Sequence, residues 1–156
     1  MNSAKNLEEI ITRRGLKMPA PPRAVGQYRP VVVSGGIVFL SGQISRQADG
    51  NLITGRLGKD LTLEQGRRAA EWATLQAVSI LQSEIGLEKV GQILRLVGYV
   101  QSADNFYAQS DVMNGASELL VEIFGESGCH ARSSIGVTSL PLNAAVELEL
   151  TIEVPS

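Results

Sequence analysis

The stretch from His130 to Val154, HARSSIGVTSLPLNAAVELELTIEV, decides the fold that we predict for this chain. In its second half, apolar and polar residues alternate from Val146 onward, which is typical of a strand with one buried face. Pro141 has no amide hydrogen and Asn143 tolerates turn geometry, so this pair indicates a turn between two extended runs. We therefore expect the whole stretch to form a β-hairpin.

The first run of this hairpin carries Arg132, and the second carries Glu147. Pairing about the turn would place Arg132 near Thr151 and Glu147 near Gly136. At about 3.3 Å per residue, the four-residue offset would separate Arg132 from Glu147 by roughly 13 Å. We therefore expect either that the two long side chains converge on a ligand or that residues of two subunits form one site.

Outward from the hairpin, sequence periodicity predicts two long helices and three further strands. Thr62 and Gln65 form a capping-box pattern before the first long helix, and the pair at 104–105 can cap the second. We expect an α+β domain in which both long helices cover one face of the sheet. The expected elements are a short helix over 6–14, a proline-rich connection over 18–23, strands over 31–33, 37–40 and 90–101, and long helices over 62–85 and 104–124.

Length and composition exclude several classes of protein. The 156 residues suit a single core, with residues 1–23 as an amino-terminal helix and proline-rich extension and residues 24–156 as the main domain. The net charge of -2 offers no electrostatic case for binding nucleic acid. A single cysteine excludes an internal disulfide framework, and no metal-ligand spacing is present. No apolar run is long enough to span a membrane, and we expect a cytoplasmic protein with no membrane partner.

Several segments, taken in order, resemble the Rid family (also called YjgF) of enamine/imine deaminases. The most specific is the run ARSSIGVTSLP over 131–141 followed by VELE over 146–149. The others are AVGQY over 24–28, which ends in Tyr28; VFLSGQI over 38–44, which contains Ser41 and Gly42; and Asn114 in the second long helix.

This resemblance implies a chorismate-mutase-like fold of the bacillus type, assembled as a homotrimer with sites in the clefts between subunits. It implies hydrolysis of reactive 2-imino and enamino acids, such as 2-aminoacrylate, to keto acids and ammonia, with no cofactor or metal. Arg132 would bind the substrate carboxylate and Glu147 would hold or activate water. The chain resembles a longer bacterial subgroup, and Ser134 stands where many members have cysteine. The implied pocket residues are Tyr28, Ser41, Gly42, Asn114 and Ser134.

The chemistry of Arg132 agrees with this role, because a guanidinium binds a carboxylate through two parallel hydrogen bonds and stays charged. The alternative for Arg132 is a salt bridge to Glu147 or Glu149 of a neighbouring subunit. For Glu147 the alternative is an exposed strand face. The neighbouring His130 could act as a general base, but its place in a loop favours a surface residue.

Three functions therefore stay open. The first is an imine/enamine deaminase, and the second is a protein that binds a small carboxylate without turnover. The third, an endoribonuclease, is disfavoured by the negative charge and by an aromatic content of only 4%.

Overall fold

The computed structural model describes residues 3–155; residues 1, 2 and 156 lie outside it, and with them the outer ends of the two predicted units, 1–23 and 24–156. The order of helices and strands agrees with the sequence prediction. The elements are α1 (Ser3–Arg13), β1 (Val31–Ser34), β2 (Ile37–Ile44), α2 (Leu63–Glu84), β3 (Gln92–Gln101), α3 (Gln109–Phe124), β4 (Ala131–Val137) and β5 (Val146–Glu153), with short 3-10 turns at Leu87–Lys89, Gly125–Gly128 and Pro141–Asn143.

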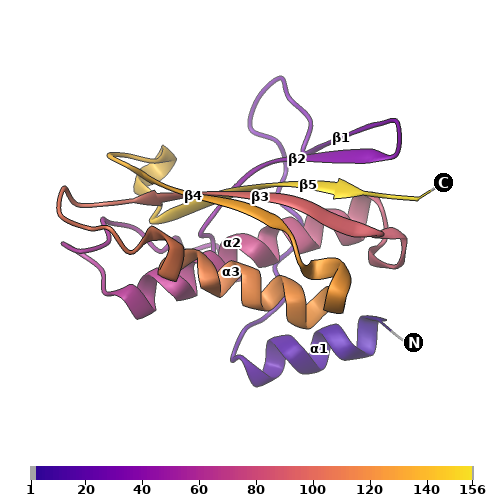
Figure 1. The fold of residues 1–156 in the computed structure, drawn as a ribbon, viewed down its shortest axis with the longest axis horizontal. Helices are drawn as coiled ribbons and strands as arrows, with labels where there is room; N and C mark the ends of the chain where they lie inside the picture. The colour runs from indigo at the N-terminus through magenta and orange to yellow at the C-terminus, as the bar shows by residue number, and fades with distance from the viewer. Residues whose placement is uncertain (1–2, 156) are drawn as a thin grey trace.

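The described strands form one five-stranded sheet in the order β1-β2-β5-β3-β4. Both long helices lie against one face of this sheet, and the opposite face carries no helix among the described residues (Figure 1). This arrangement confirms the predicted α+β class. We call the two sides of the sheet the helix face and the open face.

The first long helix begins where its capping residues predicted. The Thr62 side chain accepts a hydrogen bond from the Gln65 amide, and the Gln65 side chain accepts one from the Thr62 amide. This reciprocal pair satisfies two of the amides that a helix start leaves unpaired. Trp72 on this helix is 6% exposed and belongs to the core.

The second long helix starts at Gln109, later than the Asp104-Asn105 pair predicted. The backbone before it is engaged elsewhere, because the Ala103 amide bonds to the Leu57 carbonyl and the Phe106 amide to the Ala103 carbonyl. These contacts hold the segment against the loop before α2, which competes with an earlier helix start.

The predicted β-hairpin over 130–154 is wrong. β4 pairs with β3 in parallel, whereas β5 lies between β3 and β2 and is antiparallel to both. Strand β3 separates the two runs, and its backbone pairs with β4 on one edge and with β5 on the other. A strand in this central position is largely buried, as its apolar residues show: Ile93, Leu96, Val97 and Val100.

The connection between β4 and β5 therefore passes the end of β3 instead of turning tightly. Its 3-10 turn contains Leu142 and Asn143 in left-handed backbone conformation, at φ 56° and 59°. Gln101, the last residue of β3, holds this turn: its side chain accepts from the Leu140 amide at 2.9 Å and donates to the Asn143 side chain at 2.7 Å. The polar end of β3 thus fixes the crossover.

Helix α1 packs on the helix layer and joins the same core. Leu7, Ile10 and Ile11 are buried there, and Arg14 bonds Glu71 at 2.6 Å and Glu122 at 2.8 Å. Each buried aliphatic side chain contributes about 1.5–3 kcal/mol. Three of them hold α1 against the helix layer, and the partly buried Arg14–Glu71 ion pair adds to this contact.

Candidate functional site

Arg132 lies on the edge strand β4 and points to the helix face. It pairs with the buried Leu96 of β3, so the two side chains share that face. Its guanidinium meets one side of α3. Nη1 donates to Asn114 Oδ1 at 2.9 Å and to Ser117 Oγ at 3.0 Å, and Nη2 donates to the Ser110 carbonyl at 3.3 Å.

All three acceptors are neutral oxygens. Among the described residues, no carboxylate forms an ion pair with Arg132. A guanidinium has five N–H groups, and these contacts use both Nη1 hydrogens and one Nη2 hydrogen. The Nε–H and the second Nη2–H have no acceptor in the described part of the chain. This edge of Arg132 matches the two oxygens of a carboxylate.

Ser134 lies two residues further along β4 and therefore on the same face. It pairs with Gly98, where a Cβ would overlap Met113 of α3. The Ser134 hydroxyl is buried and has no hydrogen-bond partner in the structure. A buried hydroxyl without a partner is costly, so a partner for this group would have to come from outside the described contacts. The structure thus gathers Arg132, Asn114 and Ser134, which the sequence named, around the α3–β4 edge.

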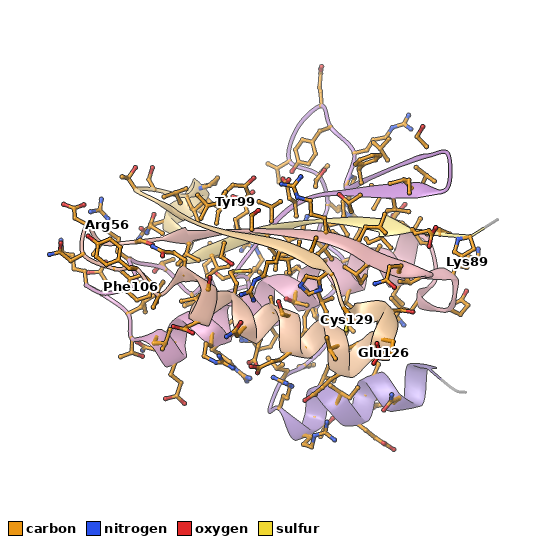
Figure 2. All side chains as sticks on the ribbon, in the orientation of Figure 1. Arg56, Lys89, Tyr99, Phe106, Glu126 and Cys129 are labelled. Carbon is orange, nitrogen blue, oxygen red and sulfur yellow. The ribbon has the colours of Figure 1, made fainter. Side chains whose placement is uncertain are left out.

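The other predicted residues lie elsewhere, around Glu147 on the open face. Glu147 pairs with Tyr99 of β3 on one side and with Ile44 of β2 on the other. Burial, and next the neighbouring Glu149, raise the pKa of Glu147 above its ordinary value. Figure 2 shows Tyr99 on the open face, away from the helices.

Gly42 makes room for the Glu147 carboxylate. The pairing of β2 with β5 shifts between Leu40 and Gln43, and this bulge brings Gly42 against Glu147. A Cβ at position 42 would overlap the Glu147 carboxylate oxygen. Glycine at this position therefore follows from the close approach of a charged side chain.

Ser41 and Tyr28 belong to this second group as well. The Ser41 hydroxyl donates to the Arg29 carbonyl at 2.7 Å, and the Ser41 amide bonds to the Pro30 carbonyl at 2.9 Å. These bonds hold the segment after Tyr28 against the bulge in β2. The Tyr28 side chain is 55% exposed.

The two groups do not form one site within a chain. Arg132 is level with Leu150 across β3, and Glu147 is level with Ile135, which corrects the positions expected from a hairpin. Two strand spacings and three residues separate their backbones by about 14 Å. Their side chains also point to opposite faces, so a small ligand cannot touch both.

Sequence reasoning missed two neighbours of these groups, Ser117 and Tyr99, and misjudged the burial of a third, His130. Ser117 lies three residues after Asn114, one helical turn away, so the spacing could have indicated it. Tyr99 stands beside Glu147, and its pKa is raised by burial and then by Glu149 and Glu147. His130, interpreted from the sequence as a surface residue, is half-buried and bonds Ser117.

The described residues contain no helix long and apolar enough to cross a membrane. In the same part of the chain, no group of three or more His, Cys, Asp or Glu side chains is placed to hold a metal ion.

Comparison with known proteins gives a consistent result. A family model described as "YjgF/chorismate mutase-like, putative endoribonuclease" matches residues 8–154. Protein TCP17 of Trypanosoma cruzi is 40% identical over 145 residues, covering 92% of this chain and 91% of the relative. A 2-iminobutanoate/2-iminopropanoate deaminase of Dermatophagoides farinae is 28% identical over 138 residues, covering 88% and 93%. The crystal structure of Atu1372 from Agrobacterium tumefaciens superposes with a TM-score of 0.91 at 31% identity, covering 98% and 95% of the two chains.

Proposed function

Because this chain belongs to the YjgF/chorismate-mutase-like family, we propose that it hydrolyses small 2-imino and enamino acids to keto acids and ammonia. Family membership confirms the resemblance seen in the sequence, and a deaminase among the relatives supports the reaction class. One observation carries the proposal: Arg132 is held by neutral oxygens and keeps one edge free for a carboxylate. A 2-imino acid has a carboxylate beside its electrophilic carbon.

The reaction needs few groups beyond this anchor. An enamino acid first takes a proton on carbon to become the imine. The oxygen of a water molecule then bonds to the imine carbon while the nitrogen gains a proton, and the C–N bond breaks to release ammonia and leave the keto acid. Glu147 is suited to accept a proton from the water and return it to the leaving nitrogen, because its raised pKa brings it closer to neutral pH. Fixing the carboxylate and the water supplies the orientation.

The positions of Arg132 and Glu147 support a site that two copies of the chain share. Within one chain the sheet lies between them, but the α3–β4 edge of one copy can meet the open face of another. Apolar side chains on that open face would be covered by such a contact: Phe39 is 51% exposed, Val32 48% and Ile135 44%. The two meeting surfaces differ, so the contact is heterologous, and in the expected homotrimer three such contacts would close into a ring.

The direct test measures keto-acid formation from a freshly generated 2-imino acid. Arg132→Ala should lower kcat/KM at least about a hundredfold, because the loss removes a two-bond ionic contact to the substrate. Arg132→Lys should restore only part of it, since a single ammonium cannot form the parallel pair. Arg46→Ala is the matched control, because among the described residues the Arg46 guanidinium bonds only the carbonyl of Gly50 in its own loop. Normal turnover by Arg132→Ala would refute the assignment.

The alternative, a carboxylate-binding protein without turnover, uses the same edge of Arg132. Protection of the wild-type protein from thermal unfolding by pyruvate, together with no activity across a panel of imino acids, would select it. An endoribonuclease, which the family description also names, would have to cleave RNA with a chain of net charge -2. RNA cleavage that persists in Arg132→Ala after stringent purification would favour that activity over ours.

A further inference from the structure

A chain of hydrogen bonds runs behind Arg132, on the side away from its free edge. His130 Nδ1 lies 2.6 Å from the Gly128 carbonyl oxygen, and His130 Nε2 lies 3.0 Å from Ser117 Oγ. Ser117 Oγ is in turn 3.0 Å from Arg132 Nη1. We call these residues, His130, Ser117 and Arg132, the relay.

The two ends of the relay determine the direction of every bond in it. A carbonyl oxygen can only accept, so His130 Nδ1 must carry a hydrogen. A guanidinium can only donate, so Ser117 Oγ must accept from Arg132. The single Ser117 hydrogen is then free to donate to His130 Nε2, which accepts it only if the imidazole is neutral. The relay is complete with neutral His130 alone.

The relay occupies one particular nitrogen of Arg132, Nη1. Nη1 has two hydrogens, and Ser117 and Asn114 take one each. With Nη1 occupied, the guanidinium keeps its Nε–H and one Nη2–H for a ligand. The orientation of Ser117 therefore decides which edge of Arg132 faces outward.

We infer that His130, acting through Ser117, is a positioning residue that holds the free edge of Arg132 ready for the substrate carboxylate. This inference rests on the proposed function. Protonation of His130 would put a hydrogen on Nε2 and turn it toward Ser117. The hydroxyl oxygen would then face two cationic donors, and its own hydrogen would lose its acceptor. Acid should thus loosen Arg132 and weaken carboxylate binding.

The surroundings of His130 support a neutral imidazole. Burial lowers its pKa, the Gly128 carbonyl opposes this effect, and the positive charge of Arg132 lowers the pKa further. The acidic side chains of α3 are engaged elsewhere, Glu118 with Arg67 and Glu122 with Arg14. The remaining charged or titratable groups on the elements around His130 are Arg95 and Tyr99 of β3, Asp111 of α3, Glu126 of the turn before β4, and the exposed Cys129.

The test measures pyruvate binding by calorimetry between about pH 8 and pH 5.5, so that it does not depend on turnover. His130→Ala and Ser117→Ala should each weaken binding about tenfold at neutral pH, the effect of one hydrogen bond to a charged group. His130→Gln should bind normally, because its amide oxygen can replace Nε2 as the acceptor without titrating. Wild-type binding should weaken as the pH falls through the lowered pKa of His130, and His130→Gln should lack this weakening. Cys129→Ser, next to His130 but outside the relay, is the matched control.

Three results would overturn the relay. The first is His130→Gln with the pH dependence of the wild type. The second is a double variant, His130→Ala with Ser117→Ala, whose fold-loss of pyruvate affinity equals the product of the fold-losses of the two single variants. Members of one chain of hydrogen bonds should not act independently, so the relay predicts a smaller combined loss. The third is a pyruvate affinity equal to that of the wild type in both single alanine variants. If one alanine variant fails to fold, the other variant and His130→Gln still decide the question.

Turnover separates this inference from the proposed function. If the wild type is a deaminase, His130→Ala should raise KM about tenfold and change kcat less than about twofold. The substitution would weaken binding of the substrate carboxylate by Arg132 and would leave the attacking water in place. Inactive wild-type protein that shows the expected pyruvate binding would refute the deaminase and keep the relay. An active wild type with Arg132→Ala inactive and His130→Ala normal would refute the relay alone.

Discussion

Strands β4 and β5 come from one stretch of 25 residues, yet they occupy different environments. β4 is an edge strand that pairs with β3, and its candidate site residues, Arg132 and Ser134, face α3. β5 is paired with a strand on each edge, and its candidate site residue, Glu147, lies on the open face of the sheet. The proposed anchor for a ligand and the proposed acid–base group therefore lie on opposite faces of one sheet.

This difference teaches how such a chain can keep a reactive site incomplete until it assembles. An arginine on the helix face can be oriented by a neighbouring helix, and a carboxylate on the open face can be desolvated by neighbouring strands. Neither group meets its partner within the chain. Contact between two copies would bring them together and would cover the apolar side chains of the open face at the same time.

The largest expected effect tests whether the two faces belong to different subunits. Arg132→Ala and Glu147→Gln should each lower activity about a hundredfold or more, because one removes the anchor and the other the proton acceptor. Denaturing the two variants together and refolding them at equal amounts should restore activity to about a quarter of the wild type, since random assortment completes about one shared site in four. The measurement is the specific activity of the mixture.

The control for this experiment mixes each variant with itself under the same conditions. A mixture of the two variants that stays as inactive as its components, although mass spectrometry shows mixed oligomers, would place both groups in one subunit. That outcome would refute the proposal that β4 of one subunit and β5 of another supply one site.

A smaller effect is expected from two glycines that lie on the two faces. At Gly42, a Cβ would overlap the Glu147 carboxylate; at Gly98, it would overlap Met113. Gly42→Ala should displace the acid–base group and lower kcat about tenfold, whereas Gly98→Ala should mainly cost stability, about 1–3 kcal/mol from overpacking.

Rates and urea unfolding of both glycine variants check this contrast. Equal losses of kcat in the two would mean that the open face has no special part in catalysis. Because the end of the Met113 side chain can move aside, we expect the destabilisation of Gly98→Ala to lie in the lower part of its range.

The smallest effect concerns the pH dependence of Glu147. Burial first, and Glu149 next, raise its pKa, so a larger fraction is protonated at mildly acid pH than for an ordinary glutamate. If ionised Glu147 is the base, kcat should rise with pH through this raised pKa, and Glu149→Gln should move the rise to lower pH by a fraction of a unit. A pH profile of kcat checks this.

The same change should leave the pH dependence of pyruvate binding in place, because that dependence belongs to His130. A shift in binding and none in kcat would reverse the roles assigned to the two faces. The two profiles therefore separate the open face from the helix face by measurement.

Local features of the sequence predicted the parts of the fold that depend on near neighbours in the chain. The Thr62–Gln65 capping box set the start of α2 because both partners lie within one turn. The alternation after Val146 correctly predicted which side of β5 is buried. The Asp104-Asn105 pair misled us, because contacts of the backbone with the loop near Leu57, distant in sequence, decided where α3 begins.

The candidate site was predictable in its components and not in its arrangement. Motif spacing pointed to Arg132, Asn114 and Ser134, and these lie together at the α3–β4 edge. No spacing in the sequence relates His130 to Ser117, which are 13 residues apart and come from different elements. Their contact exists because β4 packs against α3, so it could only be seen in the folded chain.

By itself, the sequence determined the helices, the strands and the residue types that can carry the chemistry, because periodicity, caps and side-chain chemistry are local properties. Only the tertiary structure decided that β3 lies between β4 and β5 and that Arg132 and Glu147 point to opposite faces. The physical reason is that strand pairing is chosen by the burial and hydrogen bonding of the whole sheet. Here β3 has β5 on one edge and β4 on the other, which satisfies its backbone hydrogen bonds, and no turn signal near Pro141 could reveal this.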